Sequence, residues 1–486
     1  MVKLRDLTAQ LEVGTWVGDD PDVRALAYDS RNVRPGSVFV AIPGTVADGH
    51  DFIVQAIALG AAAVIVEKEH PRLSVPQVVV EDSRRALAEM AGRFFDYPSR
   101  RLELLGVTGT NGKTTTTYLL ESIFRYAGRR TGLIGGIEYR IDGERYEAER
   151  TTPESLDLQQ ILAAMVTAGV EMAVMEVSSH ALALGRVDGC RFAGRIFTNL
   201  SQDHLDYHDD IEDYFNAKAR LFTDPDFGSG AVVVNSDDGY GRRLLEGAGG
   251  CSYGKDPRAD YSISRIVYEG DSMCYELTGP SGTLKIACPL LGDFNVSNSA
   301  AAAALALELG VDGPDVVAGI AALRKVPGRF ESINCDQDFY VLVDYAHTPD
   351  GLEKVLTAAR ELAAGHRLIA VFGCGGDRDK GKRPLMGRIG ATLSDIAIVT
   401  SDNPRSEPPR EIIDDILAGI DGPDRKHTKV KVEREDAIVD AVGEARSGDV
   451  VVIAGKGHEN YQLIKDRVLP FDDRLVAKRA LRKLCV

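Results

Sequence analysis

A glycine-rich segment with one lysine and several threonines, GTNGKTT at residues 109–115, is the strongest sign of chemistry in the sequence. It follows the apolar run LELLGV and precedes a helix-like stretch, which is the usual setting of a phosphate-binding loop. Glycines let backbone N–H groups approach phosphates, a helix N-terminus favours negative charge, a lysine adds a cation and a threonine hydroxyl can reach Mg²⁺. The predicted phosphate-binding residues are Gly109, Thr110, Asn111, Gly112, Lys113, Thr114 and Thr115. Val107 stands where the strict motif begins with glycine, so a plain glycine-rich turn is the alternative.

Glu176 could lie near such a loop, and His204 and Lys218 are two further polar residues that follow it along the chain. Glu176 ends the apolar run MAVMEV, where a carboxylate could hold Mg²⁺, although capping of a neighbouring helix is an alternative. His204 lies in DHLDYH after the run RIFTNL and could be a second metal ligand, but the pattern alone favours an exposed polar loop. Lys218 lies in YFNAKARLF, where helical periodicity alone predicts a solvated lysine.

Four apolar runs in the last third of the chain each end in a polar, Gly-rich or Pro-containing motif: VLVDYAHTP, LIAVFGCGGDRDKGKR, IAIVTSDNPR and VVVIAGKGHE. Parallel strands of an open α/β sheet bring their C-terminal ends to one edge, so we expect these motifs to form one wall of an active site. Asp344, which ends the first run, could accept hydrogen bonds from ribose hydroxyls or hold the next turn. Asn403–Pro404 is by itself an ordinary turn signal.

The elements that must position these residues are predicted to form three α/β domains. The chain of 486 residues is too long for one compact core, and typical domain sizes suggest about three. A linker at 96–100 and the segment VPGR at 326–329 give predicted domains of 1–98, 99–330 and 331–486. Alternation from about residue 258 to 290 predicts antiparallel strands, and GDFNVSNSAAAAALALELG then predicts a long helix.

The composition excludes several classes of function. A net charge of −16 argues against a nucleic-acid partner or an anionic membrane surface, because either would need a broad basic surface. The N-terminal residues contain no long apolar segment, so we expect neither a secretory signal nor a membrane anchor and predict a cytoplasmic protein. The seven cysteines are scattered, which predicts reduced thiols rather than a zinc site or a disulfide framework.

In their order along the chain, the motifs closely resemble the Mur ligase family. The resemblance covers essentially the whole chain and rests on GTNGKTT, EVSSH, NLSQDHLDYH, AKARLF, NVSNSAAA, PGRFE, DYAHTPD, GCGGDRDKGKR, DNPR and GKGHE. It implies a UDP-binding N-terminal domain, a central P-loop ATPase-like domain and a Rossmann-like C-terminal domain that binds an amino acid. The segment DNPR is similar to members that add meso-diaminopimelate, rather than lysine, to UDP-N-acetylmuramoyl-L-alanyl-D-glutamate. We expect a monomer that uses ATP as co-substrate and Mg²⁺ as cofactor.

The resemblance also implies roles for individual residues. The UDP-muramoyl-dipeptide would contact Tyr28, Ser30, Thr45, Val46, Ala47, Thr151, Thr152, Ser178 and Arg186. Besides the phosphate loop, ATP would contact Asn295, Asn298, Arg329 and Asp344. Diaminopimelate would contact Arg378, Asp402, Asn403, Pro404, Arg405, Gly455 and Glu459. The implied catalytic residues are Lys113, Lys218 and His204, and the implied metal ligands are Thr114, Glu176, His204 and Lys218 as a carbamate. The chain departs from the family pattern at Arg150, where Asn is usual, and at Leu184, where some members carry Gln.

The implied reaction activates a carboxylate that would otherwise react poorly with an amine. The D-glutamyl γ-carboxylate would take the γ-phosphoryl group of ATP, and the amine of diaminopimelate would then displace phosphate from the acyl phosphate. We expect the C-terminal domain to swing onto the other two and shield this intermediate from water. Arg405 is predicted to bind the carboxylate that distinguishes diaminopimelate from lysine, the alternative being that it braces the turn after Pro404.

Two other functions remain open at this stage. A ligase of the folylpolyglutamate synthase type would share the mechanism but take another acceptor, and the YDSR-containing N-terminal domain and DNPR argue against it. An ATP-driven switch or binding module would form no bond at all. Whether ADP release requires both a carboxylate and an amine substrate separates these possibilities.

Overall fold

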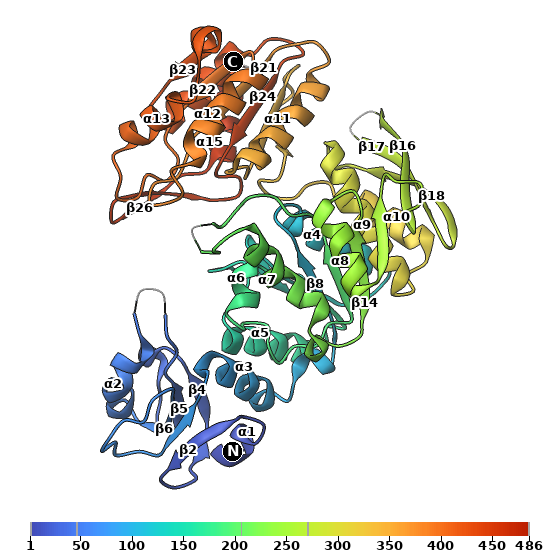
Figure 1. Ribbon diagram of the computed structural model, residues 1–486. Coiled ribbons are helices and arrows are strands. Elements are labelled where there is room, and N and C mark those ends of the chain that lie inside the picture. The colour runs from blue at the N-terminus through green and yellow to red at the C-terminus, as the bar shows by residue number, and fades with distance from the viewer. Residues whose placement is uncertain (1, 45–46, 206, 270–271, 485–486) are drawn as a thin grey trace.

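The computed structural model describes residues 2–44, 47–205, 207–269 and 272–484. It contains three principal β-sheets that follow one another along the chain, with the sheet of the middle segment lying between the other two (Figure 1). Helices cover both faces of each sheet, so the predicted α/β fold class is confirmed. The N-terminus and the C-terminus lie at opposite ends of the molecule (Figure 1).

The N-terminal segment forms a five-stranded sheet in the order β2-β7-β6-β5-β4, in which only β2 is antiparallel to its neighbour. Its strands are β2 (Val13–Val17), β4 (Ala25–Ala27), β5 (Ser37–Val40), β6 (Ala61–Val66) and β7 (Gln77–Val80). The short strands β1 (Val2–Lys3) and β3 (Asp22–Val23) pair separately. The helices are α1 (Leu4–Thr8), α2 (Ile53–Ala58) and α3 (Ser83–Phe94), with 3₁₀ turns η1 (Ser30–Asn32), η2 (Gly49–Phe52) and η3 (Pro98–Arg100).

The middle segment forms an eleven-stranded sheet, β11-β10-β9-β12-β8-β13-β14-β15-β16-β17-β18. Strands β9 (Thr131–Ile134), β12 (Met172–Glu176), β8 (Glu103–Thr108), β13 (Gly194–Phe197), β14 (Ala231–Asn235), β15 (Cys251–Gly254) and β16 (Tyr261–Glu269) are parallel. The antiparallel edges are β10 (Glu138–Ile141), β11 (Glu144–Glu147), β17 (Ser272–Gly279) and β18 (Gly282–Cys288). The antiparallel strands predicted at 258–290 are therefore confirmed for β16 to β18.

The helices of the middle segment are α4 (Lys113–Tyr126), α5 (Ser155–Thr167), α6 (Ser179–Ala183), α7 (Ile211–Thr223), α8 (Gly239–Ala248), α9 (Asp293–Glu308) and α10 (Gly313–Ala322), with the 3₁₀ turn η4 (Pro225–Phe227). Helix α9 is the long helix that the sequence predicts. Its alanines at 300–304 are fully buried against α4 and the sheet, and their small side chains allow this close packing.

The C-terminal segment forms a six-stranded sheet in the order β19-β20-β24-β21-β22-β23, parallel except for β19. The strands are β19 (Glu331–Ser332), β20 (Tyr340–Asp344), β21 (Leu368–Phe372), β22 (Ile396–Val399), β23 (Thr428–Val430) and β24 (Val450–Ala454), followed by the hairpin β25 (Tyr461–Ile464) and β26 (Arg467–Pro470). The helices are α11 (Pro349–Ala363), α12 (Lys382–Leu393), α13 (Pro409–Leu417), α14 (Arg434–Glu444) and α15 (Asp473–Leu484), with the 3₁₀ turn η5 (Gly422–His427).

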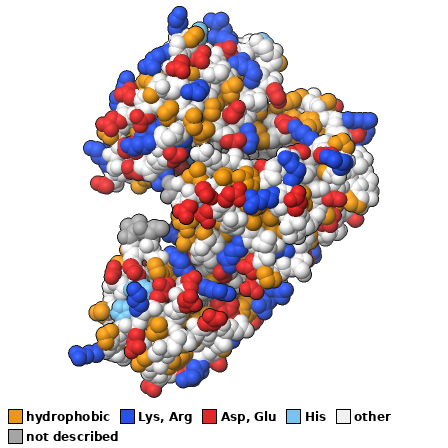
Figure 2. Space-filling view, in the orientation of Figure 1, with side chains coloured by type: hydrophobic (Ala, Val, Ile, Leu, Met, Phe, Trp, Pro, Cys, Tyr) orange, Lys and Arg blue, Asp and Glu red, His pale blue; other side chains and the backbone are white. Residues whose placement is uncertain are grey.

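The strands of the parallel sheets read as continuous apolar runs because both of their faces are buried. In the C-terminal sheet, alternate residues of β20 and β24 belong to two separate apolar clusters, one on each face. No described helix is long and apolar enough to cross a membrane. On the face shown in Figure 2, cationic and anionic side chains are intermixed, without one broad basic area.

Candidate active site

The predicted phosphate loop lies between β8 and α4. Gly109 and Gly112 have φ angles of 144° and 87°, in the region that favours glycine. A Cβ atom on Gly109 would lie 2.0 Å from Thr198 Oγ1, and a Cβ atom on Gly112 would lie 2.3 Å from Asn298 Oδ1. Both positions therefore require glycine. Helix α4 begins at Lys113, and the N–H groups of its first turn are available to an anion.

The segment that follows β13 is hydrogen-bonded to the loop. Thr110 N donates to Asn199 O over 2.8 Å, and Asn111 N donates to Asn199 Oδ1 over 3.0 Å. The hydroxyl of Thr110 lies 3.2 Å from Ser201 O, while Thr115 is buried in the first turn of α4. These contacts fix the backbone of the loop.

Two lysine ammonium groups meet at one carbonyl oxygen of this loop. Lys113 Nζ donates to Gly109 O at 2.9 Å and to Thr110 O at 2.8 Å. Lys218 Nζ donates to the same Gly109 O at 2.8 Å and lies 4.5 Å from the centre of the Tyr214 ring. Burial lowers the pKa of Lys113, and burial together with the Lys113 charge holds the pKa of Lys218 well below its ordinary value. Burial thus disfavours the charged form of both lysines, and an anion bound beside them would favour it.

The prediction that Lys218 is solvated on periodicity grounds is wrong, because its side chain is only 1% exposed. Helix α7 buries Tyr214, Phe215, Leu221 and Phe222, and Lys218 falls in the middle of this apolar stripe at helical spacing. The stripe was visible in the sequence and was the signal that could have identified Lys218 as a buried lysine.

Glu176, at the end of β12, faces the first turn of α4. Its Oε2 accepts from Thr114 Oγ1 at 3.0 Å and its Oε1 accepts from Gly136 N at 2.9 Å. Neither partner is a backbone N–H group of a helix, so Glu176 does not cap a helix as the alternative reading required. Arg329 Nη2 donates to the same Thr114 hydroxyl at 3.1 Å, and its guanidinium lies over the Tyr345 ring. A carboxylate, a hydroxyl and a guanidinium thus surround the end of the loop.

His204 lies in a partly exposed loop beside the two lysines. Its φ angle is 55°, and its Nε2 lies 3.5 Å from Asp203 Oδ2. Burial of the ring, opposed by Asp203 and reinforced by His180 and the nearby lysines, lowers the pKa of His204 to about 4. The imidazole is therefore neutral near pH 7, which is the form that can act as a ligand. The structure places His204 near this cluster, and its role as a metal ligand remains a prediction.

Asn298 of α9 lies against the loop, and Asn295 is hydrogen-bonded to Asn298. Asn298 Nδ2 donates to Asn295 Oδ1 at 3.0 Å, and Asn295 Nδ2 donates to Leu291 O at 2.8 Å. Both are buried, and Asn298 lies directly against Gly112. They are therefore fixed beside the phosphate loop.

Asp344, at the end of β20, is buried and holds the backbone on either side of it. Its Oδ2 accepts from Phe330 N at 2.6 Å and its Oδ1 accepts from Ala346 N at 2.7 Å. Burial raises the pKa of this carboxyl group against the opposing effect of Arg329. The turn-holding alternative is what the structure shows, and contact with a ribose remains a prediction.

The residues predicted to bind the uridine nucleotide lie in the N-terminal segment. Tyr28 Oη donates to Asp157 Oδ2 on α5 at 2.6 Å, and burial and this carboxylate raise the pKa of Tyr28. Ser30 Oγ donates to Gln55 Oε1 at 3.1 Å, and Ala47 is exposed. Thr45 and Val46 lie outside the described residues.

The residues predicted to bind the muramoyl-dipeptide lie together near the N-terminus of α5. Thr152 Oγ1 accepts from Ser178 N at 3.1 Å, and Thr152 O accepts from Arg186 Nη1 at 3.3 Å. Thr151 packs against Gly136, next to the Glu176 contact. The buried carboxylate of Glu154 lies beside this group, 3.3 Å from Arg186 Nε.

The two departures from the family pattern lie at the edge of this group. Arg150 Nη1 is 3.8 Å from Glu154 Oε2, and Arg84 of α3 reaches the same oxygen at 3.2 Å. Leu184 follows the last residue of α6. Together with Arg186, three guanidinium groups from three segments of the chain thus lie near the Glu154 carboxylate, a feature that the sequence did not reveal.

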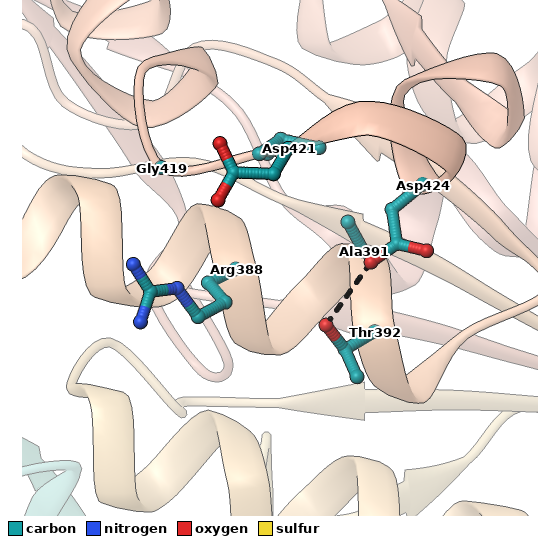
Figure 3. A pocket seen from close by; sticks show the side chains of 7 residues that line it. Arg388, Ala391, Thr392, Gly419, Asp421 and Asp424 are labelled. Carbon is teal, nitrogen blue, oxygen red and sulfur yellow. Dashed lines mark hydrogen bonds between the residues drawn. The ribbon is translucent and has the colours of Figure 1, made fainter.

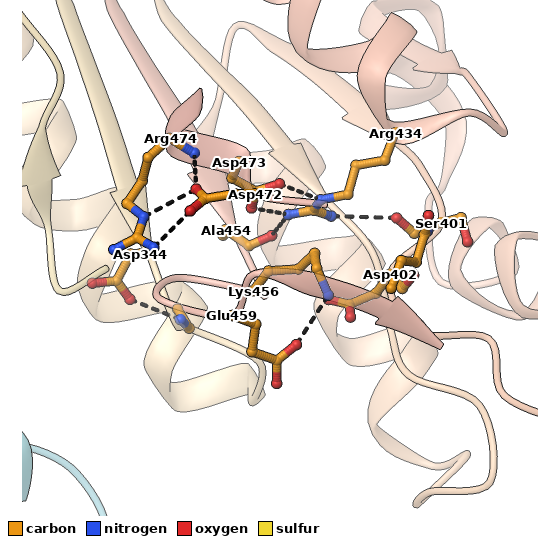
Figure 4. Close-up of polar contacts among 12 residues, drawn as sticks. Asp344, Ser401, Asp402, Arg434, Ala454, Lys456, Glu459, Asp472, Asp473 and Arg474 are labelled. Atoms are coloured by element: carbon orange, nitrogen blue, oxygen red, sulfur yellow. Dashed lines mark hydrogen bonds and ion pairs between the residues drawn. The ribbon is translucent and has the colours of Figure 1, made fainter. Parts of the chain in front are cut away.

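The C-terminal ends of β20, β21, β22 and β24 lie at one edge of the sheet, as predicted, because these strands are parallel. Figure 4 shows residues at the ends of β20, β22 and β24. Asn403 Nδ2 donates to Glu459 Oε2 at 2.8 Å. The ammonium of Lys456, which is 0% exposed, donates to Asn403 Oδ1 at 3.0 Å and to Glu459 Oε2 at 2.9 Å. Asp402 packs against Gly455, where a Cβ atom would lie 2.4 Å from Asp402 Oδ2. Sequence reasoning missed Lys456, although it lies within GKGHE.

A second buried cation supports the same edge. Arg434 Nη2 donates to Asp473 Oδ2 at 2.7 Å and to Ala454 O, the last residue of β24, at 2.9 Å (Figure 4). Asp473 and the Arg434 side chain are both 0% exposed. The pair fixes the end of β24, and with it the position of the GKGHE segment.

Two arginines flank the glycines that follow β21. A Cβ atom on Gly375 would lie 2.9 Å from Arg405 Nη1 and 3.8 Å from Arg378 Cγ. Arg405 Nη1 donates to Gly376 O at 2.7 Å, so this side chain does brace a loop. Its φ angle of 52° is strained for a residue with a side chain, and Pro404 lies directly before it. Strain of this kind is common where a side chain is held for binding.

Described His, Cys, Asp and Glu side chains nowhere form a group of three or more that could hold a metal ion. The predicted metal ligands instead combine single groups from β12, α4, α7 and the loop that contains His204. The site thus offers oxygen donors around a phosphate loop, not a preformed protein cage.

Two cavities lie elsewhere in the structure. One, of about 360 Å³, is lined by Arg388, Thr392, Asp421 and Asp424 and by none of the predicted site residues (Figure 3). The other, of about 590 Å³, lies where α10 leads into β19 and includes Arg329 in its lining. Neither contains the full set of residues described above.

Three family models match the chain in sequence. The Mur ligase family, catalytic domain, matches residues 22–95, the Mur ligase middle domain matches 107–306, and the Mur ligase, glutamate ligase domain, matches 328–457. Among solved structures, a mycobacterial folylpolyglutamate synthase is 19% identical, with a TM-score of 0.62, and covers 82% of this chain and 95% of its own. That similarity shows the fold alone.

Other relatives are much more similar in sequence. The UDP-N-acetylmuramoyl-L-alanyl-D-glutamate–2,6-diaminopimelate ligase of Gloeobacter violaceus is 48% identical, covering 99% of this chain and 98% of its own. The protein of the same name from Geobacillus kaustophilus is 46% identical, and the match covers 99% of this chain and 100% of that protein. A solved structure of a ligase of that name is 33% identical, with a TM-score of 0.70, and covers 100% of this chain and 99% of its own. The chain therefore belongs to the Mur ligase family.

Proposed function

We propose that this protein joins meso-diaminopimelate to the D-glutamate of UDP-N-acetylmuramoyl-L-alanyl-D-glutamate in peptidoglycan precursor synthesis, with conversion of ATP to ADP and phosphate. The observation that carries the proposal is the arrangement of two charged sites across one domain boundary. The phosphate loop with Lys113 and Lys218 lies on the central domain, and the Asn403, Arg405 and Glu459 group lies on the C-terminal domain. Arg329 links the two, because it donates to Thr114 of the central domain and its guanidinium lies over the ring of Tyr345 in the C-terminal domain.

The chain's own residues can perform each step of this reaction. N–H groups of the loop and the Lys113 ammonium neutralise charge on the transferring phosphoryl group, which passes from ATP to the glutamyl carboxylate. The amine of diaminopimelate then attacks the acyl carbon, the bond to the phosphate oxygen breaks, and the amine loses its proton. Thr152, Ser178 and Arg186 are positioned to hold the dipeptide, because they adjoin the residue pair Glu176 and Thr114.

Mg²⁺ fits the donor groups on the central domain. Thr114 Oγ1 and Glu176 Oε2 lie 3.0 Å apart at the loop, and hydroxyl and carboxylate oxygens suit a hard cation. Mg²⁺ usually combines one or two carboxylates with substrate phosphates and water, which agrees with the lack of a larger described His, Cys, Asp or Glu group. When bound, it would supply charge neutralisation at the phosphates. We propose Thr114, Glu176, His204 and carbamylated Lys218 as its protein ligands.

We further propose that the enzyme is a monomer and that it acts in the cytoplasm, where ATP is available. To test this function, the protein is incubated with Mg-ATP, UDP-muramoyl-dipeptide and either diaminopimelate or lysine, and the mass of the nucleotide product is measured by mass spectrometry. A mass increase of one diaminopimelate residue supports the proposal. ADP release that needs neither the UDP-muramoyl-dipeptide nor an amino acid would instead indicate an ATP-driven switch. A product formed only with a different carboxylate substrate or a different amino acid would indicate a related ligase.

Replacing Arg405 with alanine should lower kcat/KM for diaminopimelate by at least ~100-fold, while the weak activity with lysine changes much less. A guanidinium matches the extra carboxylate of diaminopimelate bidentately, and lysine lacks that group. Because Arg405 also donates to Gly376, a small loss common to both substrates is expected.

The matched control for this prediction is Arg410→Ala, which removes an exposed guanidinium from α13 of the same domain. It should leave both kcat/KM values near those of the wild type. Equal losses for the two amino acids in Arg405→Ala would show that Arg405 only braces its loop.

A further inference from the structure

The phosphate loop touches the C-terminal domain through a residue that no part of the proposed chemistry uses. Asp350 lies in the first turn of α11, and its Oδ2 accepts from Asn111 Nδ2 at 2.7 Å and from Ser201 Oγ at 2.9 Å. The partners stand 239 and 149 residues away in sequence, on the central domain. One carboxylate oxygen thus joins the loop that holds the phosphates to the domain that holds the amino acid.

Both partners of Asp350 are themselves fixed parts of the loop structure. Asn111 O accepts from Thr198 Oγ1 at 2.6 Å, and Ser201 N donates to Thr110 Oγ1 at 3.0 Å. In this conformation of the loop, the Asn111 amide and the Ser201 hydroxyl both point to Asp350. A contact to these two groups depends on the local geometry to within a fraction of an ångström.

The C-terminal side of the contact is equally well defined. Thr348 caps α11 by accepting from Gly351 N at 3.1 Å, and Pro349 occupies the first helical position. Asp350 is thereby held at the helix N-terminus, where its negative charge is favoured. Lys354, one turn later, donates to the same Oδ2 at 2.9 Å but belongs to the same helix. Lys354 therefore stabilises the carboxylate without bridging the domains.

We propose that Asp350 is a positioning residue that docks the amino-acid-binding domain onto the phosphate loop, so that the amine reaches the acyl phosphate before water does. The proposal rests on the proposed function. Without the contact, the C-terminal domain would dock less often. Water would then attack the acyl carbon, the bond to the phosphate oxygen would break, and free carboxylate and phosphate would result. ATP would be consumed with no amide formed.

The measurement that isolates this role is the ratio of ADP released to nucleotide tripeptide formed. The wild type should give a ratio near one. In Asp350→Ala the ratio should rise at least about threefold, and kcat for tripeptide should fall by about 10- to 100-fold, the size expected for a misplaced reactant. A loss of folded protein would lower both products together and leave the ratio unchanged. Asp350→Asn keeps an acceptor oxygen, so its ratio of ADP to tripeptide should lie between those of the wild type and Asp350→Ala.

Two further variants separate the interdomain contact from local effects. Lys354→Ala keeps both interdomain hydrogen bonds and should retain a ratio near one. Ser201→Ala removes one of them and should shift the ratio in the same direction as Asp350→Ala, but less. A ratio near one with wild-type kcat in Asp350→Ala would overturn the proposal. Absence of tripeptide from the wild type would instead overturn the proposed function, so the two failures are distinguishable.

Discussion

Replacing Lys113 with alanine is expected to lower the rate of ligation at least ~10³-fold, because the change removes a cation that neutralises charge on the transferring phosphoryl group. In the structure the Lys113 ammonium folds back onto the carbonyl oxygens of Gly109 and Thr110, within the curve of the loop. An ammonium in this position can follow a phosphoryl group with a small movement of a flexible side chain. The measurement is kcat for tripeptide formation, together with the thermal unfolding midpoint.

The control for this experiment is Lys285→Ala, which removes an exposed lysine from β18 in the same domain. It should leave kcat unchanged. The unfolding midpoint of Lys113→Ala should stay near that of the wild type, since the loop backbone is held by Asn199. Turnover in Lys113→Ala close to that of the wild type would remove the basis for the phosphate-loop assignment.

The second large effect is expected at Lys218, which we predict to carry CO₂ as a carbamate. Its Nζ is buried 2.8 Å from Gly109 O and close to the Lys113 charge, an environment that favours the neutral amine. A neutral amine can attack CO₂ to form the carbamate with release of a proton. The resulting anion would offset the Lys113 charge and offer an oxygen ligand to Mg²⁺, which an ammonium cannot do.

¹³C-labelled bicarbonate should therefore give a carbamate carbon resonance in the wild type that is absent from Lys218→Met. Turnover of this variant should fall by ~10²- to 10³-fold, the size typical of losing one group that stabilises transition-state charge. Methionine fills a similar volume in the buried stripe on α7, so we expect Lys218→Met to fold like the wild type. A fully active Lys218→Met, or a resonance that persists in it, would refute the carbamate.

Local features of the chain were predictable because they depend on neighbours in sequence. The loop at 109–112, the start of α4 at Lys113 and the apolar parallel strands follow from glycine conformation, helix capping and burial on both sheet faces. Convergence of the motifs after β20, β21, β22 and β24 also followed, because parallel strands end at one edge. These signals are carried within segments of about ten residues.

Long-range contacts were decided only by the tertiary structure. Nothing local to Glu176 or Thr114 indicates that their side chains meet, and the contact of Arg329 with Thr114 spans 215 residues. The apolar stripe of α7 indicated that Lys218 is buried, but its contact with Gly109 O, 109 residues away, depends on the tertiary structure. Likewise, Asp350 and Lys456 stood in recognisable motifs without an assigned role. The sequence determined which elements form and which polar groups end them, whereas the packing of distant elements decided which of those groups are buried, paired and brought together.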